Sequence, residues 1–271
     1  MKRWKKWVII STAVLATAAV AGGFAYRRVA VLRYPEGKDH IDYRDVPDNI
    51  LLREVYIPSS ALYIARCSFY FCESLRSVHM QPGLRSIGSR AFSGCRRLKE
   101  VEIPNTVNFI GAGAFHFCDN LQTVVMPPVL DSIRNNTFSY CFRLSEINIP
   151  DSVVYIGTSA FDMCSALQSV ELPPTVNYIG ESAFFDCQAL DSIIIPKPVK
   201  ALHHMSFGNC LNLQSITFLG RVDTINRMAF HHCENLREIR IPRGSKRHYR
   251  RVLDRNQLSE LKEKLVETKT R

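Results

Sequence analysis

A cysteine recurs every 23 residues along most of this chain. Phenylalanine, leucine and isoleucine recur with the same step at their own positions, and no insertion or deletion interrupts the series. The cysteine row consists of Cys72, Cys95, Cys118, Cys141, Cys164, Cys187, Cys210 and Cys233. A fixed period of this length is typical of solenoids, in which like units stack and bury a continuous core. The period therefore predicts one continuous stack of coils.

Each unit follows the pattern L-x-x-V-x-I-P-x-x-V-x-x-I-G-x-x-A-F-x-x-C-x-x-L. Alternating apolar residues such as Val101 and Ile103 predict a short strand with every second side chain inward. Pro104 ends that strand because it lacks a backbone donor. The Ala-Phe pair predicts a compact helical or turn-like segment packed inward. The glycine column, interpreted as a turn that needs positive φ, contains Gly88, Gly111, Gly157 and Gly180. Because all units have one length, their strands should form a parallel sheet along one side.

The ends of the chain depart from the repeat. The expected parts are residues 1–33 as a signal peptide or transmembrane anchor, 34–54 as an N-terminal cap and half-repeat, 55–242 as eight repeats and 243–271 as a basic helical cap. Val46, Asn49 and Leu52 fall in the Phe, Cys and Leu columns. The apolar side of one broken helix, or of two short ones, is predicted at Tyr249, Leu253, Leu261 and Leu265. This segment should cover the last repeat, unless it is a basic amphipathic helix that binds a membrane or partner.

The N-terminal segment has the features of an export signal. A basic cluster, Lys2-Arg3-Trp4-Lys5-Lys6, precedes an uncharged apolar run from Trp7 to Tyr26. A run of about twenty residues suffices to span a bilayer as a hydrophobic helix. Ala19-Val20-Ala21 also fits a cleavage site, so we leave an anchor and a cleaved signal peptide both open, with the anchor favoured. Either would send the rest of the chain out of the cytoplasm.

The cysteines are not expected to form disulfides or a metal site. Equivalent side chains in stacked coils point in parallel about 4.8 Å apart, whereas a disulfide needs converging β-carbons near 3.8 Å. We expect each thiol of the row to be a small buried group near a turn. Zinc is disfavoured because the chain has no C-x-x-C pair and no histidine in phase with the row. Cys67 lies outside the row and is expected to be either buried or exposed at the surface without a role.

The sequence offers little that is typical of an enzyme or a nucleic-acid binder. It has neither a G-x-S-x-G elbow nor a phosphate-binding glycine loop, so we expect no catalytic residues and no cofactor. The pairs His203-His204 and His231-His232 leave a histidine-based hydrolase as a remote alternative. The net charge is +10, but the excess of Lys and Arg sits at the two ends and the middle is slightly acidic. That distribution argues against nucleic-acid binding.

Two columns are candidates for partner binding. The outward positions of the predicted strands hold His79, Glu102, Val125, Asn148, Glu171, Ile194, Thr217 and Arg240. Val125 and Ile194 are apolar where solvent is expected. A second column, just before the isoleucine, contains the aromatic residues Tyr63, Phe109, Tyr155 and Tyr178. Solvent-facing aromatics are typical interface anchors, although these rings could instead pack on neighbouring turns.

The repeat resembles the BspA-like bacterial surface leucine-rich repeats. Ala114-Phe115-His116-Phe117-Cys118, then Leu121 and Ile133, carry the resemblance, which covers about residues 46–242. It implies a leucine-rich-repeat solenoid, α/β but mostly β, with a parallel sheet on one face and short helical or turn segments opposite. Proline is missing at Gln81 and Leu219, and glycine at Arg134, His203 and Asn226, which should alter local turns only.

The resemblance also suggests a role. Members of the family are typically secreted or surface proteins implicated in adhesion and host-protein binding. We therefore expect a non-catalytic, extracytoplasmic scaffold at a bacterial envelope that binds a protein or glycan. The alternative is a structural spacer that needs no specific ligand.

Overall fold

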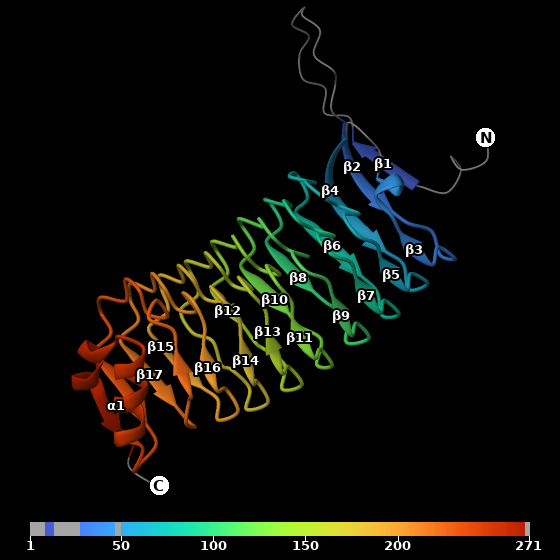
Figure 1. Cartoon of the computed structure of the whole chain (residues 1–271). Coiled ribbons are helices and arrows are strands. Elements are labelled where there is room, and N and C mark those ends of the chain that lie inside the picture. The colour runs from blue at the N-terminus through green and yellow to red at the C-terminus, as the bar shows by residue number, and fades with distance from the viewer. Residues whose placement is uncertain (1–8, 14–27, 47–49, 269–271) are drawn as a thin grey trace, which may run out of the picture.

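The coils stack into an elongated solenoid with two rows of strands (Figure 1). The computed structural model describes residues 9–13, 28–46 and 50–268. The first row contains β4 (Ile50–Ile57), β6 (Ser77–Met80), β8 (Glu100–Glu102), β10 (Thr123–Val125), β12 (Glu146–Ile147), β15 (Ser192–Ile195), β17 (Ser215–Phe218) and β19 (Glu238–Ile241). Neighbours pair in parallel with a 23-residue offset, as between Val101 and Val124. Between β12 and β15, one coil has no named strand in the first row, and a parallel bridge between Asn148 and Glu171 pairs it with the preceding coil. The predicted parallel, mostly β solenoid is confirmed.

The second row of strands is an addition to what the repeat pattern predicted. It contains β3 (His40–Ile41), β5 (Tyr63–Ile64), β7 (Ser86–Ile87), β9 (Phe109–Ile110), β11 (Ser132–Ile133), β13 (Tyr155–Ile156), β14 (Tyr178–Ile179), β16 (Ala201–Leu202) and β18 (Thr224–Ile225). Each strand pairs in parallel with the coil before or after it, as Ile133 does with Ile156. The Ala-Phe segments that follow form turns rather than helices. A typical coil therefore has two short strands, a proline corner between them and a turn segment that closes the coil.

Phenylalanine rings form a stack along the core. The rings of Phe115 and Phe138 lie 5.7 Å apart and are 4° from parallel. Similar stacking continues from Phe69 to Phe230, and these side chains are buried. Offset stacking adds to the burial of large apolar surface, so this row links each coil from Phe69 to Phe230 to the next.

Glycine recurs at one position of the repeat for a different reason from the one we expected. Gly88, Gly111, Gly157 and Gly180 do not adopt positive φ. A β-carbon on Gly180 would instead lie 2.6 Å from the backbone carbon of Gly157 in the preceding coil. Glycine is therefore needed for close approach of two backbones. Positive φ is found at other columns, mostly at residues with side chains, such as Arg90 and Phe117.

The N-terminal coil extends further than the repeat pattern indicated. β2 (Arg28–Arg33) pairs in parallel with β4, and Leu32, Tyr34 and Ile41 are buried in the core. A 3-10 helix, η1 (Tyr43–Asp45), follows β3. The segment 34–54, expected to be a half-repeat, contributes to both strand rows, because it contains β3 of the second row and the start of β4 in the first. The sheet thus begins inside residues 1–33, which we expected to be a signal or anchor.

An additional strand, β1 (Ile9–Ala13), pairs antiparallel with β2. The part of the apolar run that the structure describes is therefore a strand, which does not match the predicted hydrophobic helix. Pairing with β2 satisfies backbone groups that an edge strand leaves open. The rest of the run, including the Ala19-Val20-Ala21 site, lies outside the described residues. Among the helices that the structure describes, none has the length and apolar character needed to cross a bilayer.

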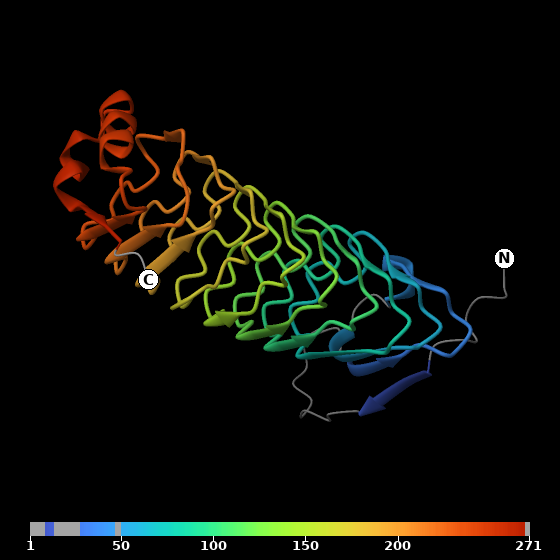
Figure 2. The ribbon, with the colours of Figure 1, turned by 90° about the horizontal axis from the view of Figure 1, so that it is seen from below.

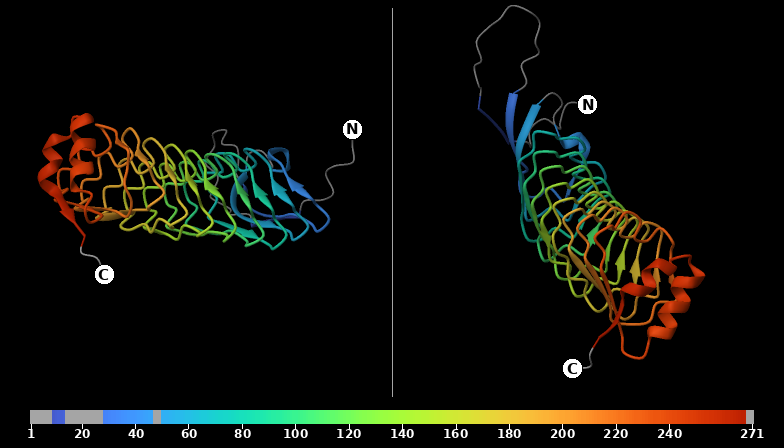
Figure 3. Two further views of the ribbon diagram at one scale, coloured as in Figure 1. Left: turned by 60° about the horizontal axis from the view of Figure 1, so that its bottom comes forward. Right: turned by 90° about the vertical axis from the view of Figure 1, so that its left-hand side faces the viewer.

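The C-terminal segment packs on the last coils (Figures 2 and 3). It consists of α1 (Lys246–Arg255), the 3-10 helix η2 (Ser259–Lys264) and β20 (Leu265–Glu267). The four apolar residues that we singled out, Tyr249, Leu253, Leu261 and Leu265, are all buried. The Tyr249 hydroxyl donates to the Gly220 carbonyl over 2.6 Å, and its ring contacts Phe218 at 5.2 Å. β20 adds a strand to the first row beside β19, which the helical pattern did not indicate.

Candidate binding surface

The outward positions of the first strand row form one continuous column. All eight residues expected there lie on the outer side of the sheet, and all but the half-buried Thr217 are exposed. Their neighbours in sequence point inward: Val101 and Ile103, on either side of Glu102, are buried. Val125 and Ile194 are 58% and 53% exposed, so two large apolar side chains stand in solvent on this face.

The column continues toward the N terminus beyond the predicted residues. The ring of Tyr56 stacks on His79 with centroids 4.3 Å apart, and the Arg33 guanidinium lies 3.5 Å from the Tyr56 ring centroid. Tyr56 also donates to the Glu54 carboxylate over 3.2 Å. Arg33 and Tyr56 were not among the predicted residues because the outward column was begun at His79, although both keep its 23-residue step.

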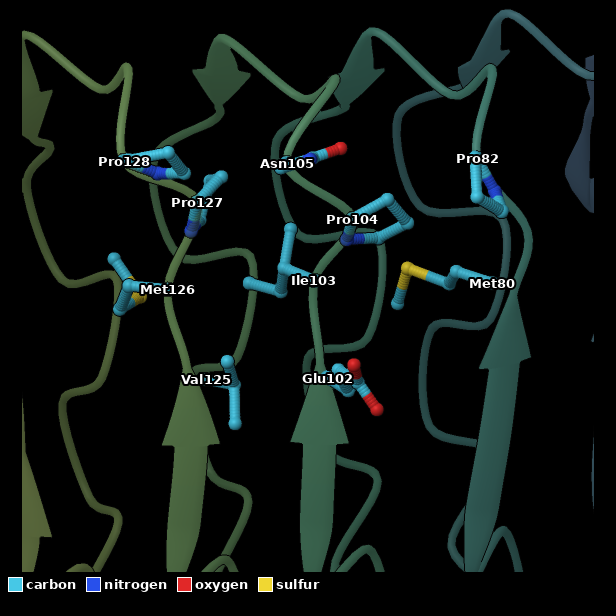
Figure 4. A pocket seen from close by; sticks show the side chains of 10 residues that line it. All are labelled: Met80, Pro82, Glu102, Ile103, Pro104, Asn105, Val125, Met126, Pro127 and Pro128. Carbon is cyan, nitrogen blue, oxygen red and sulfur yellow. The ribbon is translucent and has the colours of Figure 1, made fainter.

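A groove lies at the proline corner between the two strand rows (Figure 4). It has a volume of about 460 Å³ and crosses three coils. Its lining residues are Met80, Pro82, Glu102, Ile103, Pro104, Asn105, Val125, Met126, Pro127 and Pro128. Glu102 and Val125 belong to the outward column, so the groove is continuous with that surface. It was not expected, because no single column of the repeat marks it.

The aromatic column lies on the second strand row and does not merge with the first. Tyr155 and Tyr178 stack with centroids 4.9 Å apart, and Tyr178 contacts the His203 ring at 4.9 Å. The guanidinium of Arg134 lies 4.5 Å from the Phe109 ring centroid. Tyr63 stacks on His40 at 5.5 Å. The rings therefore pack on neighbouring coils and still keep part of their surface in solvent.

A third aromatic group, which sequence analysis missed, occupies the turn segments. The rings of His116 and Phe117 lie 4.1 Å apart, and Phe117 and Tyr140 lie 4.4 Å apart. Phe142 extends the group and is 38% exposed. These positions vary from coil to coil, so the repeat gave no signal for them.

The cysteine row lies in the core, and its thiols from Cys95 to Cys187 are held in the protonated form. The thiols from Cys95 to Cys210 are fully buried, and each lies within hydrogen-bonding distance of a phenylalanine carbonyl in the preceding coil. Burial raises the pKa of the Cys141 thiol far above its ordinary value. Cys72, at the start of the row, is partly exposed, and burial raises its pKa to about 11. A thiol that stays protonated is a poor nucleophile.

The histidine pairs do not assemble a metal centre. His231 contacts the ring of its sequence neighbour His232, while His203 packs on Tyr178. Within residues 9–13, 28–46 and 50–268, no group of three or more His, Cys, Asp or Glu side chains is arranged to hold a metal ion.

Asp162 is an acidic residue whose pKa is shifted upward. Burial raises its pKa to about 6, with a smaller contribution from the charge of Asp186, and a hydrogen bond from Ser139 opposes the shift.

The repeat and its geometry agree with a known family. The family model described as BspA type Leucine rich repeat region matches residues 48–168 and 131–259, with six copies. This chain belongs to the BspA-type leucine-rich repeat family. The resemblance inferred from the Ala-Phe, Cys and Leu columns is thereby confirmed.

Solved structures that are similar to this chain come from several bacteria. A leucine-rich repeat protein from Bacteroides ovatus is 23% identical, with a TM-score of 0.60 over 86% of this chain and 69% of that one. The leucine-rich repeat protein of T. pallidum is 26% identical, with a TM-score of 0.48 over 83% of this chain and 88% of its own. The pneumococcal vaccine antigen PcpA is 19% identical, with a TM-score of 0.48 and coverages of 86% and 71%. None of the curated proteins compared matches the chain.

Two departures from the BspA-type pattern have a structural consequence. Where proline is replaced by Gln81, the backbone N–H donates to the Ile57 carbonyl over 3.3 Å. At Leu219 the N–H donates to the Ile195 carbonyl over 3.0 Å. Proline could make neither bond, so these two corners carry one more hydrogen bond between coils.

Proposed function

We propose that this BspA-type chain is a non-catalytic scaffold that binds a protein partner through the outward column of its first strand row. The feature that supports this most directly is the exposure of Val125 and Ile194 on an otherwise polar face. Apolar side chains held on a rigid sheet lose little entropy on binding and gain from leaving water. The eight candidate residues are spread over eight consecutive coils, so a partner would meet them along an extended strip.

We further propose that the chain acts outside the cytoplasm, at a bacterial surface. The basic cluster followed by the apolar run from Trp7 to Tyr26 supports export. Membership in the BspA-type family is consistent with this location. The C-terminal segment then serves as the cap of the stack, since α1, η2 and β20 cover apolar residues of the final coils.

Site-specific photo-crosslinking in the full-length chain tests the binding face. A crosslinking amino acid replaces Ile194 in one variant and Leu211 in a control, because Leu211 is also exposed but lies on a turn segment. Both are incubated with envelope proteins of the source bacterium. We expect a discrete adduct at residue 194, absent at 211, and lost when Glu171→Ala and Val125→Lys are added. Equal labelling at both positions, or no adduct at 194, contradicts the proposal and favours a structural spacer.

A further inference from the structure

The groove at the proline corner has rigid walls and an apolar floor (Figure 4). Pro82 stands on one side and Pro127 with Pro128 on the other, while Ile103 and Pro104 lie between them. Proline rings have a fixed φ, so these walls are preformed before anything binds. Its volume of about 460 Å³ exceeds what one large side chain requires and lies within the range of about 300–1,000 Å³ found for binding pockets.

Methionines give the groove its adaptable sides. In the column that ends the first strand, Ile57, Ile103 and Ile149 are buried. Met80 and Met126 alternate with them and remain partly exposed beside the groove. Methionine is unbranched and polarizable, and it adjusts to differently shaped apolar groups. The floor is therefore suited to an apolar side chain rather than to a sugar, which needs several polar contacts.

The rim of the groove carries an unpaired negative charge. The Glu102 carboxylate is exposed and takes part in none of the hydrogen bonds or ion pairs found in the described part of the chain. On the outward positions from β6 to β12, the acids Glu100 and Glu146 accompany it, and no Lys or Arg is present. The basic residue nearest to Glu102 in the sequence around β8 is Lys99, which directly precedes the strand and lies about 10 Å away along it.

We propose that this groove receives an apolar side chain from an extended protein segment that carries Lys or Arg beside it. The apolar side chain lies between the proline walls, against Met80 and Met126, and the basic group pairs with Glu102. Val125, at the edge of the groove and mostly exposed, is covered by the same segment. The inference rests on the proposed function and adds the chemistry of the partner to it. A neutral glycan would leave Glu102 unpaired.

Methionine methyl NMR on the full-length chain tests the groove directly. The chain has six methionines, and Met163, Met205 and Met228 lie outside the groove as internal references. With ¹³C-methyl-methionine labelling, the probe is the peptide Gly-Ser-Leu-Lys-Lys-Ser-Gly. We expect it to shift the Met80 and Met126 signals and leave the three references unchanged. The matched peptides Gly-Ser-Leu-Glu-Glu-Ser-Gly and Gly-Ser-Ala-Lys-Lys-Ser-Gly should bind more weakly, because one reverses the charge and the other removes the apolar side chain.

Variants of the rim separate charge from shape. Glu102→Gln should weaken binding of the Leu-Lys-Lys peptide about two- to fivefold, as expected for an exposed ion pair. Glu102→Lys should make the acidic peptide the better ligand. Glu234→Gln changes an exposed acid on a turn segment and should leave the affinity unchanged. Unshifted Met80 and Met126 signals, equal binding of the acidic peptide, or wild-type affinity in Glu102→Gln would each overturn the inference.

The two proposals fail in different ways. If the peptides leave the groove signals unchanged while crosslinking at residue 194 persists, the groove inference falls and the binding scaffold stands. If crosslinking is also absent, the proposed function itself is rejected. The reference methionine signals show in the same spectrum that each variant is folded.

Discussion

The thiol of Cys118 donates a hydrogen bond to the carbonyl oxygen of Phe92 in the preceding coil, with 3.3 Å between sulfur and oxygen. The same relationship, 26 residues apart, repeats from Cys95 to Cys233. The phenylalanine carbonyl also accepts a backbone N–H within its own coil, as Phe92 does from Cys95 over 3.2 Å, so the thiol adds a second bond that joins one coil to the next. This explains a preference for a small side chain that is apolar in bulk yet can donate.

Replacing one thiol of the row should destabilise the chain. Cys141→Ala removes the bond between coils to the Phe115 carbonyl, which keeps the Cys118 N–H, and it opens a small cavity, so the free energy of unfolding should fall by about 1–2 kcal/mol. Chemical denaturation monitored by circular dichroism measures the change. Cys67→Ser, at a partly exposed position outside the row, should change stability by less than about 0.5 kcal/mol. Equal effects of the two substitutions would mean that the row has no special role.

Thiol reactivity should follow burial. In the native chain at pH 8, iodoacetamide should modify Cys67 first, because it is partly exposed, and Cys72 more slowly, since its pKa is raised to about 11. Cys95 to Cys187 should remain unmodified until denaturant is added, when all nine cysteines react. Peptide mass spectrometry identifies the modified sites. Early modification of Cys118 or Cys141 in the native chain would contradict the buried row.

Adding a methyl group at the glycine column should be costly. The β-carbon of Gly180→Ala would lie 2.6 Å from two backbone atoms of the preceding coil, so the coils must separate locally. We expect a loss of about 1–3 kcal/mol, as for other overpacked sites. Gly208→Ala is the matched control, because its β-carbon would meet only side chains, the nearest atom at 3.1 Å on Phe185. Thermal melts of both variants should show a lower Tm for Gly180→Ala alone.

The stability of the chain should depend on the protonation of Asp162. Its pKa is raised to about 6, whereas a free aspartate has a pKa of about 3.9, so the folded state binds more protons between these values. Stability contributed by the protonated form is therefore lost as pH rises from about 4 to about 6. Asp162→Asn should stabilise the chain at pH 7 by about 1 kcal/mol, less than the full shift implies because the side chain is partly exposed and screened. Below pH 4 the variant and the wild type should converge, and a difference that stays constant from pH 4 to pH 7 would contradict the prediction.

The N-terminal strand β2 should contribute to the stability of the stack. A chain that starts at residue 34 loses the buried Leu32 and leaves the edge of β4 unpaired, whereas one that starts at residue 28 keeps both. We expect the shorter chain to melt about 5 °C lower. Differential scanning calorimetry of the two proteins makes the comparison. Identical Tm values would show that the solenoid begins after β2.

The 23-residue step predicted the first strand row and the inward-facing columns because equal coils must place equivalent side chains in line. The second row was harder to foresee. Its strands are two residues long, and one of the two positions changes between His, Tyr, Ser, Phe, Ala and Thr. The glycine column was correctly picked out, but its cause lies in the distance between coils, which one repeat cannot reveal.

The N-terminal coil and the groove were missed for different reasons. Tyr34, Pro35 and Ile41 match the strand, proline and isoleucine columns, but Val46 and Asn49 replace the Phe and Cys that define the repeat. The adjoining apolar run also favoured an export segment over a sheet. The groove depends on methionines and prolines from three coils together, so its shape exists only in three dimensions.

The Phe stack and the thiol bonds join each coil to its immediate neighbours alone, which has a consequence for how such a molecule can evolve. Duplication or loss of one whole 23-residue unit would leave every other contact intact and would lengthen or shorten the outer strip by about 4.8 Å. A deletion of another size within the repeat would shift the Phe and Cys positions of the later coils out of register with those of the earlier coils. The length of the outer strip can therefore change in steps of one coil, and no new type of contact between coils is required.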